Sequence, residues 1–440
     1  MHFGQMIFKK YLMSNTLRKL AVIFWQTFYN LLQFALRISA DIILKRRLRA
    51  QKEHPLRWRE RLGETNQVRP QGKLIWLHAV GLGEVMALRG LIDIILQIKP
   101  DCNFLVTSGT LKSAELFSQN LPANTTHQFI PLDARKFRRS FLTRWKPNLV
   151  IWSEQEIWPG FIKDCAKLKI PQLWINARMG DKAYNSRKWL KPFFGDLYSN
   201  FKFISAQDKK TGQNIAKFIE PNLKHRIRVD GSLKPAAPRL QSKLSIPRQI
   251  LSLIKGRKIL TIVSSHHEDE NFVINSLTTL SKEVRPVLVI IPRYTERAAI
   301  IRDKCSKAGL KCSIMSELGE ISYSPEVYVA NQIGAPAIWL PITNFALIGG
   351  TYCNVNGHNP WEPINFGVAV LHGSNTANFS EDFKELLASG SSTEILETDE
   401  LANVITQKNF DSQIKNARSL LQKKMSAVQD LSNDILLMLN

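Results

Sequence analysis

Residues 349–363 read GGTYCNVNGHNPWEP and follow an apolar run, 344–348, that is typical of a buried strand. After a short polar loop, Asn359-Pro360 predicts a helix start, because Asn is a favoured N-cap and Pro a favoured first helical residue. Free N–H groups at a helix start can hold a phosphate, and the first-turn carboxylate of Glu362 could bond a ribose hydroxyl. The pattern predicts a nucleotide site, although an ordinary strand–loop–helix corner explains these residues equally well.

The length of 440 residues predicts two domains, because single cores seldom grow beyond about 250–300 residues. Lys plus Arg number 60 against 37 Asp plus Glu, a net charge of +23. An excess of this size indicates an anionic partner: nucleic acid, acidic lipid or a phosphorylated substrate. No nucleic-acid-binding motif accompanies the charge, so charge alone selects no function. The five cysteines show no paired short spacing and are typical of reduced core thiols.

Residues 20–36 are rich in large apolar side chains but include Gln26, Asn30 and Gln33. The run falls marginally short of the roughly 20 apolar residues that a spanning helix needs. An amphipathic helix lying on the membrane is equally compatible, and the basic cluster at 45–49 would be attracted to anionic lipid. No signal-peptide cleavage site follows. Membrane association is predicted by either route, and a spanning helix would leave the rest of the chain in the cytoplasm.

Short apolar runs alternate with helix-period segments from residue 73 onward, which predicts parallel sheets with helices on both faces. The predicted strands are 74–78, 104–107, 149–152, 173–175, 203–205 and 227–229, then 259–263, 287–291, 327–330, 346–348 and 369–371. The expected divisions are an N-terminal membrane helix with its basic flank (1–50), an acceptor-binding domain (51–234), a linker (235–250), a donor-binding domain (251–405) and a C-terminal helix (406–440). We expect two doubly wound domains that face each other across a cleft, with ligands beyond the carboxyl ends of the strands.

Three segments of the first half place charged side chains at that edge. Glu84 follows a strand and a glycine-spaced turn, where it could act as a general base or simply stabilise a helix start. Glu154 and Glu156 follow the strand at 149–152; a capping box with Ser153 suits Glu156 and leaves Glu154 freer for chemistry. Lys234 precedes the linker and could neutralise a leaving phosphate, or be a solvated surface lysine.

The second half offers fewer such groups. Arg293 and Pro292 follow the strand at 287–291, and the arginine could contact a nucleotide phosphate or base; a surface helix cap is the alternative. The cluster 266–270, HHEDE, lacks the spacing of a metal site, so we interpret it as a strand end before an acidic helix start and infer no metal.

Taken together, these segments resemble the Kdo transferases of lipopolysaccharide assembly, which move 3-deoxy-manno-octulosonic acid (Kdo) from CMP-Kdo to a lipid A precursor. The likeness covers roughly residues 55–380. The matching pieces, in family order, are ERLG (60–63), HAVGLGE (78–84), TSGT (107–110), EQEIWP (154–159), NAR (176–178), GSLK (231–234), SSH (264–266), PR (292–293) with ER (296–297), and GHNPWEP (357–363).

The resemblance implies a two-domain glycosyltransferase of the GT-B type that is inverting, independent of metal and free of other cofactors, on the cytoplasmic face of the bacterial inner membrane. Glu84 matches the general base for the acceptor hydroxyl of lipid IVA, and Glu154 and Lys234 match positions that stabilise the transition state. The implied CMP site comprises Pro292, Arg293, Gly334, Ala335, Pro336, Asn359, Pro360, Trp361 and Glu362. The implied partners are CMP-Kdo, the lipid acceptor and an anionic membrane surface, with no nucleic acid.

Several positions depart from the family pattern. Gly334-Ala335-Pro336 stands where the family has Gly-Glu-Leu, so one nucleotide contact is missing. Tyr294 replaces a His, and Ser232 replaces an Asn. Two alternatives to a Kdo transferase therefore remain: a related transferase with a different sugar nucleotide or acceptor, and a non-enzymatic protein that binds anionic lipid or nucleic acid.

Overall fold

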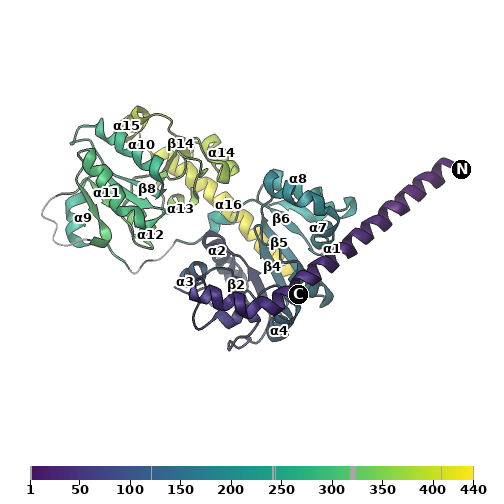
Figure 1. Ribbon diagram of the computed structural model, residues 1–440. Coiled ribbons are helices and arrows are strands. Elements are labelled where there is room, and N and C mark those ends of the chain that lie inside the picture. The colour runs from purple at the N-terminus through teal and green to yellow at the C-terminus, as the bar shows by residue number, and fades with distance from the viewer. Residues whose placement is uncertain are drawn as a thin grey trace. The chain divides into compact units, whose positions relative to one another are not determined.

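The computed structural model describes residues 2–119, 121–239, 242, 244–317, 324–407 and 409–439, and within them the side chains from residue 20 onward except those of residues 21, 82, 116 and 119. The chain forms two compact units. The first comprises Met1–Ala237 together with Ser426–Asn440, and the second comprises Pro238–Met425. Each unit is built around one parallel sheet (Figure 1).

The first unit contains a seven-stranded parallel sheet in the order β3-β2-β1-β4-β5-β6-β7. Its strands are β1 (Leu74–His78), β2 (Asn103–Ser108), β3 (Thr125–Phe129), β4 (Leu149–Ser153), β5 (Gln172–Ala177), β6 (Ile204–Ala206) and β7 (Ile227–Val229). Its helices are α1 (His2–Arg49), α2 (Leu82–Ile98), α3 (Leu111–Gln119), α4 (Arg135–Trp145), α5 (Pro159–Lys167), α6 (Asp181–Arg187), α7 (Lys191–Tyr198) and α8 (Lys209–Ala216). Short 3₁₀ turns are η1 (Trp58–Leu62), η2 (Lys188–Leu190), η3 (Pro221–Arg226) and η4 (Lys234–Ala236).

The second unit repeats this plan with the order β10-β11-β9-β8-β12-β13-β14, again all parallel. Its strands are β8 (Ile259–Ser265), β9 (Val287–Pro292), β10 (Cys312–Ile314), β11 (Val327–Val329), β12 (Phe345–Ile348), β13 (Ala369–His372) and β14 (Ser392–Glu394). Its helices are α9 (Arg248–Ile254), α10 (His267–Thr278), α11 (Ala298–Lys307), α12 (Ala335–Trp339), α13 (Trp361–Asn365), α14 (Ser380–Ala388) and α15 (Thr398–Gln407). The turns η5 (Thr295–Arg297), η6 (Met315–Glu317), η7 (Leu340–Ile342) and η8 (Ala377–Phe379) complete it. The long α16 (Asp411–Leu437) begins in this unit and belongs to the first unit from Ser426 onward.

The strand order reverses once in each sheet. In the first unit β1 pairs with both β2 and β4, and in the second unit β8 pairs with both β9 and β12. Beyond the carboxyl ends of such strand pairs the connections leave in opposite directions, and ligands of doubly wound sheets bind there. The prediction of two doubly wound α/β domains is confirmed.

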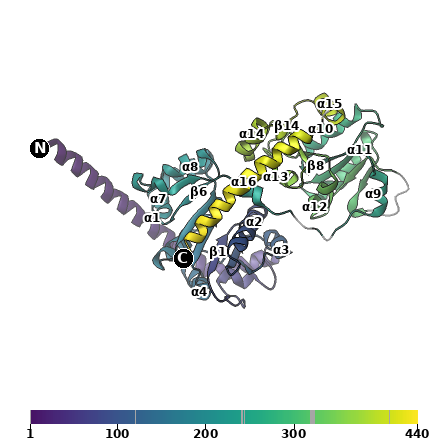
Figure 2. The same cartoon turned by 180° about the vertical axis from the view of Figure 1, so that it is seen from behind.

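Both cores are apolar and dense with aromatic rings. In the first unit, Trp76 packs edge-on against Trp152 and Phe161 at ring distances of 5.2 Å. In the second, Trp361 is fully buried in a cluster that joins α13, α14 and α16, three helices that lie side by side in Figure 2. Because these rings fix the segments that follow β4 and β12, they also position the side chains at the carboxyl edges.

Helix α1 packs against the first unit, where Figure 1 shows it passing α7 and α4. Trp25 and Tyr29 lie against the core, and Gln33, Ala40 and Leu44 are buried. Among the described residues, no helix combines the length and apolar character needed to cross a bilayer.

The motif at residues 60–63 fastens the chain before β1 to the sheet. Arg61 is buried, and its guanidinium donates to the carbonyls of Gly109 (2.6 Å) and Ile130 (3.1 Å). Gly63 has φ 76°, and a Cβ there would meet the carbonyl oxygen of Phe137 at 2.4 Å. This motif therefore serves the fold.

The predicted strands agree with the structure, whereas three observed strands were missed. These are β3, β10 and β14. Each lies at the outer end of its sheet. Such a strand covers less of the core, so its sequence carries a weaker apolar signal.

Helix α2 approaches η4 closely at Gly90. A Cβ at this position would lie 1.8 Å from the carbonyl oxygen of Ala236. Ala236 is buried two residues after Lys234, so contact with α2 holds the segment that carries this lysine. Gly83 lies in the same helix, and a Cβ added there would meet no described atom within 4 Å.

We expect Gly90→Ala to lower the free energy of unfolding by about 1–3 kcal/mol, because backbone must move to admit the methyl group. Gly83→Ala should instead raise it by up to about 1 kcal/mol, since alanine loses less entropy in a helix. Denaturant titration followed by tryptophan fluorescence measures both changes. Equal effects of the two substitutions would contradict the close approach.

Candidate functional site

The carboxyl edge of the first sheet gathers three acidic side chains. Glu84 lies in the first turn of α2, directly after β1, and Glu154 and Glu156 follow β4. Because β1 and β4 are neighbours at the point where the strand order reverses, both segments end at the same place. The Glu84 carboxylate acts electrostatically on the other two carboxyls, as expected for groups that share one site.

Glu84 has one engaged oxygen and one open oxygen. Its Oε2 accepts hydrogen bonds from the backbone N–H of Val80 (3.0 Å) and Gly81 (3.2 Å), which closes the start of α2. Its Oε1 makes no hydrogen bond to any residue that the structure describes. The side chain is partly exposed. Glu84 therefore does stabilise the start of α2, as one of the two predictions expected, yet its Oε1 remains able to accept a proton.

Glu154 is held much more tightly. It is buried and adopts a left-handed backbone with φ 54°. Its Oε1 lies 3.8 Å from Nζ of Lys234 and 3.4 Å from Nδ2 of Asn176. Burial raises the pKa of the Glu154 carboxyl; the Lys234 ammonium opposes this shift and the Glu84 carboxylate adds to it. Glu154 and Lys234 thus form a partly desolvated ion pair beside Glu84.

Asn176 links these parts, and its role was not predicted from the sequence. This residue is the last but one of β5 and has a left-handed conformation with φ 49°. Its Nδ2 donates to Glu154, while its Oδ1 accepts from the backbone N–H of Leu233 at 3.1 Å. The sequence signals were an Asn near a strand end, since Asn tolerates the left-handed region better than most residues, and the family match NAR at 176–178, which gave no role to the Asn.

The expected capping box of Ser153 and Glu156 is wrong. Helix α5 begins at Pro159, and Ser153 belongs to β4, where its buried hydroxyl has no partner among the described residues. Glu156 instead accepts from Nε1 of Trp158 at 3.2 Å. Burial raises the pKa of Glu156, as does the Glu84 carboxylate. Glu156 therefore belongs to the acidic group rather than to a helix cap.

In the second unit, the edge beyond β8, β9 and β12 carries basic, neutral and acidic groups. Arg293 follows β9 with an exposed side chain, and its backbone N–H donates to the Ser265 carbonyl at 3.1 Å. The rings of His266 and His358 stack with Nε2 atoms 2.9 Å apart. Burial lowers the pKa of His358 to about 4, and His266 and Arg293 contribute to that shift. Both imidazoles are neutral near pH 7, so one donates to the other.

Asp269, which was also missed, organises this edge. Its carboxylate accepts from the backbone N–H groups of His266 (2.8 Å), Gly350 (2.7 Å) and Tyr352 (3.2 Å). It therefore fixes the glycine loop after β12 to the start of α10. The acidic helix start expected at residues 266–270 is confirmed, and the described residues contain no group of three His, Cys, Asp or Glu that could hold a metal.

The stretch at 359–362 forms the expected corner. The side chain of Asn359 accepts from the N–H of Trp361 at 3.1 Å, and α13 begins at Trp361, one residue later than predicted. Pro360 is buried, and Glu362 lies in the first turn without a polar partner among the described residues. Burial alone raises the pKa of Glu362 to about 7. A partly exposed carboxyl with no partner is available to bond a hydroxyl group.

Two predicted contacts involve buried side chains. Ala335 is fully buried in an apolar cluster with Tyr328 and Trp339, and Trp361 donates from its indole N–H to Asp382 at 2.9 Å. Only main-chain atoms of Ala335 and Trp361 could therefore touch a ligand. The neighbours Gly334, with φ 88°, and Pro336 lie at the start of α12, while Pro292 is buried at the end of β9.

A family model described as 3-deoxy-D-manno-octulosonic-acid transferase (kdotransferase) matches residues 56–237. The 3-deoxy-D-manno-octulosonic acid transferase of Rickettsia bellii is 30% identical to this chain over 392 residues, 88% of this chain and 92% of the relative. The chain belongs to the Kdo transferase family. The corresponding transferase of Haemophilus influenzae is 27% identical over 75% of this chain and 79% of its own length. Family membership makes the chain a glycosyltransferase and disfavours a non-enzymatic binding protein.

Solved structures agree at the level of the fold. A UDP-N-acetylglucosamine 2-epimerase superposes with a TM-score of 0.53 at 12% identity, covering 84% of this chain and 95% of the epimerase. The Anabaena protein HepE in complex with UDP-glucose gives the same TM-score at 11% identity, with 83% and 99% covered. Both likenesses concern the two parallel-sheet α/β units, as in glycosyltransferases of the GT-B type.

The carboxyl of Glu362 is partly exposed, yet it is desolvated enough to raise its pKa, which predicts a pH-dependent stability. Its folded-state pKa of about 7 exceeds the ordinary 4.5, so the folded protein holds the proton more tightly. The contribution of Glu362 to the free energy of unfolding is therefore greatest below about pH 4.5, and it falls as the pH rises toward about 7. We expect Glu362→Gln to raise the free energy of unfolding at about pH 8 by roughly 1–2 kcal/mol, a value reduced for partial exposure, and to change it little at about pH 5.

Calorimetric unfolding of wild type and variant at the two pH values measures this difference. Glu296→Gln, the same change at an exposed position of the second unit, should show no such pH dependence. A Glu362→Gln difference that stays constant with pH would show that the carboxyl is not desolvated.

Proposed function

We propose that this chain transfers Kdo from CMP-Kdo to a lipid A precursor, lipid IVA, with inversion at the anomeric carbon, during lipopolysaccharide synthesis. Membership of the Kdo transferase family supports the reaction class. One structural observation carries the proposal furthest: the open oxygen of Glu84 lies in the same site as the ion pair between buried Glu154 and partly buried Lys234.

In the proposed reaction, Glu84 is the general base. Its free carboxylate oxygen takes the proton of the acceptor hydroxyl as that oxygen attacks the anomeric carbon of the sugar. The bond from this carbon to the CMP phosphate breaks at the same time, and the electron pair leaves with CMP. The base keeps its second oxygen bonded to Val80 and Gly81, which fixes the direction of the open one.

Glu154 and Lys234 serve the charge that develops during bond breaking. The anomeric carbon gains positive character and the departing phosphate gains negative charge. A preoriented ammonium group stabilises the negative charge on the phosphate, and a nearby carboxylate stabilises the positive character of the anomeric carbon. Glu154 also holds Lys234 in place, helped by Asn176, so that neither group must reorganise when the charge appears.

The second unit supplies the proposed donor site. The cationic side chain of Arg293 makes no hydrogen bond to any described residue, which leaves its guanidinium available to a phosphate or base of CMP. Glu362 offers a hydroxyl acceptor for the ribose. Ala335 presents a buried methyl group where the family carries a glutamate, so the nucleotide has one contact fewer. A relaxed or altered donor preference is the alternative that this substitution favours.

The acceptor is a lipid, and the proposed location is the cytoplasmic face of the bacterial inner membrane. Helix α1 supports this location. The apolar side chains Leu20, Phe24, Phe28, Leu31, Ile38 and Ile42 are each 47–67% exposed. Their spacing of three, four or seven residues places them along one side of the helix, as in helices that lie in a membrane interface.

Glu84→Gln tests the general base. The amide oxygen still accepts the N–H groups of Val80 and Gly81, so the start of α2 is preserved while the proton acceptor is lost. We expect kcat for transfer from CMP-Kdo to lipid IVA to fall by about 10²–10⁴-fold, with little change in melting temperature. Product mass spectrometry measures the rate and the number of sugars added. Glu115→Gln, an equal change at an exposed position of α3, should leave kcat within a factor of about two of wild type; transfer by Glu84→Gln at the wild-type rate would place the base elsewhere.

Arg293→Gln tests the donor site. Hydrogen bonds to a charged group contribute about 1.5–3 kcal/mol, so we expect the Kd for CMP to rise by about 10–100-fold. Titration calorimetry measures this constant without any transfer reaction. Arg248→Gln removes an exposed arginine of α9 in the same unit and should leave the affinity unchanged. An unchanged Kd for Arg293→Gln would exclude contact between this side chain and CMP.

A further inference from the structure

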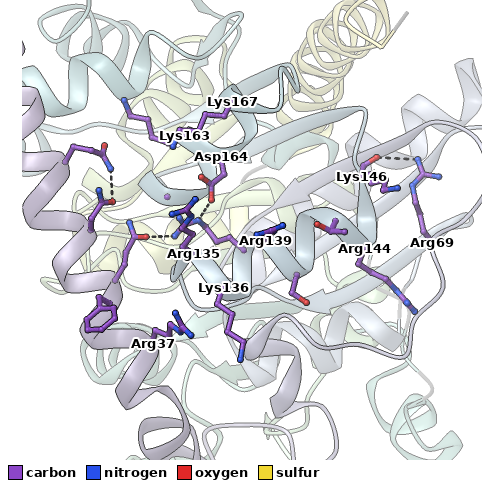
Figure 3. Close-up of a pocket in the computed structure, with 18 residues that line it drawn as sticks. Arg37, Arg69, Arg135, Lys136, Arg139, Arg144, Lys146, Lys163, Asp164 and Lys167 are labelled. Atoms are coloured by element: carbon purple, nitrogen blue, oxygen red, sulfur yellow. Dashed lines mark hydrogen bonds and ion pairs between the residues drawn. The ribbon is translucent and has the colours of Figure 1, made fainter.

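A large basic cavity lies in the first unit between α1, α4 and α5, apart from the carboxyl-edge residues described above (Figure 3). Its volume is about 1210 Å³. Ten of its lining residues are Lys or Arg, against a single acidic residue, Asp164. Neither the acceptor hydroxyl chemistry nor the nucleotide site uses any of them.

The floor of this cavity is a closed network. The buried guanidinium of Arg138 donates to Asp164 (2.7 Å), to Asp133 (2.9 Å) and to Oε1 of Gln33 on α1 (2.8 Å). The hydroxyl of Tyr29, also on α1, donates to Asp133. Asp164 and Arg138 are therefore paired with each other, and the network fastens α1 to α4 and α5.

The walls of the cavity differ from its floor, because no acidic side chain that the structure describes pairs with the following six cationic side chains. Arg37, Arg135, Lys136, Arg139, Lys146 and Lys167 are exposed. None of these six side chains makes a hydrogen bond or an ion pair with a described residue. Figure 3 shows Arg135 and Arg139 below Asp164, with Arg37 on the neighbouring α1. Like charges held around one cavity repel each other, so the arrangement is suited to a bound anion.

Phosphate groups fit these cations best, because the planar guanidinium forms paired hydrogen bonds with phosphate oxygens. The position of Arg37 indicates what carries the phosphate. On α1 this arginine lies between the buried face of Gln33 and Ala40 and the exposed apolar stripe that includes Leu31 and Ile38. A helix that lies with this stripe in a membrane interface brings the cavity beside it to the level of the headgroups.

We propose that the cavity between α1, α4 and α5 is a binding site for the phosphate headgroup of an anionic phospholipid of the membrane. This inference rests on the proposed membrane association. It identifies where the chain binds the membrane lipid and which side-chain chemistry binds it. The headgroup enters the basic cavity while its acyl chains lie along the exposed side of α1. The bilayer lipid, rather than the acceptor, occupies this site.

The test is flotation of the purified chain with acceptor-free vesicles of phosphatidylcholine with or without phosphatidylglycerol. Wild type should bind only the vesicles that contain phosphatidylglycerol. Arg135→Gln/Arg139→Gln should weaken that partitioning by about 30-fold, since each basic residue near an anionic surface contributes about 1 kcal/mol. Arg37→Gln alone should weaken it by about fivefold, and this variant leaves α4 intact should the double variant fold poorly.

The matched control is Lys202→Gln/Lys224→Gln, which removes the same charge from exposed positions before β6 and β7. Its partitioning should stay within about twofold of wild type. A second control, Leu31→Ser/Ile38→Ser, should weaken binding yet keep the preference for phosphatidylglycerol. Equal partitioning of the two charge variants would overturn the site, as would displacement of wild type from the vesicles by a duplex oligonucleotide.

Transfer is measured separately, with acceptor in detergent and no phospholipid. A chain that binds vesicles through the cavity but transfers no Kdo would refute the proposed reaction alone. A chain that transfers Kdo while the cavity variants bind vesicles like wild type would refute the lipid site alone.

Discussion

The single reversal of strand order in each parallel sheet is the constraint on which the rest depends. Between β1 and β4, and again between β8 and β12, the following segments turn to opposite faces of the sheet. The carboxyl edge is uncovered there, and side chains that follow neighbouring strands converge although they are far apart in sequence. Glu84 and Glu154 meet in this way, as do His266 and His358 in the second unit.

The acidic site shows how burial and pairing balance. A carboxyl at the position of Glu154 loses solvation, which raises its pKa and favours its neutral form, and the Lys234 ammonium opposes this shift. Removing Lys234 would take its ammonium away from the buried Glu154 carboxylate, and the uncompensated burial of a charge costs more than the pair contributes. Asn176 matters for that reason: it fixes the backbone before Lys234 and so keeps the two charges together. Glu84, by contrast, is held through backbone N–H groups and needs no countercharge.

The sequence predicted the strands that have a repeating apolar pattern. It did not predict the hydrogen bonds that join segments distant in sequence. Apolar runs predicted buried strands such as β1 and β9, whereas no such run predicted the edge strand β3. Glu84, Glu154 and Lys234 were predicted as site residues and lie together, but Asn176 and Asp269 were missed. Each of these two acts through hydrogen bonds to segments distant in sequence, and no local pattern records such bonds. Glu156 was assigned to a cap because the start of α5 was placed too early.

The distribution of charge in the first unit likewise depends on contacts between segments that are distant in sequence. A net charge of +23 could belong to an evenly solvated surface, to nucleic-acid binding or to a lipid surface, and the sequence could not decide between them. The structure places ten of the 60 Lys and Arg residues around one cavity, beside a helix whose outer side is apolar. Nucleic acid would not need the apolar stripe, and a solvated surface would not gather its cations against α1. The proposed contact with a bilayer that carries acidic headgroups would account for both features at once.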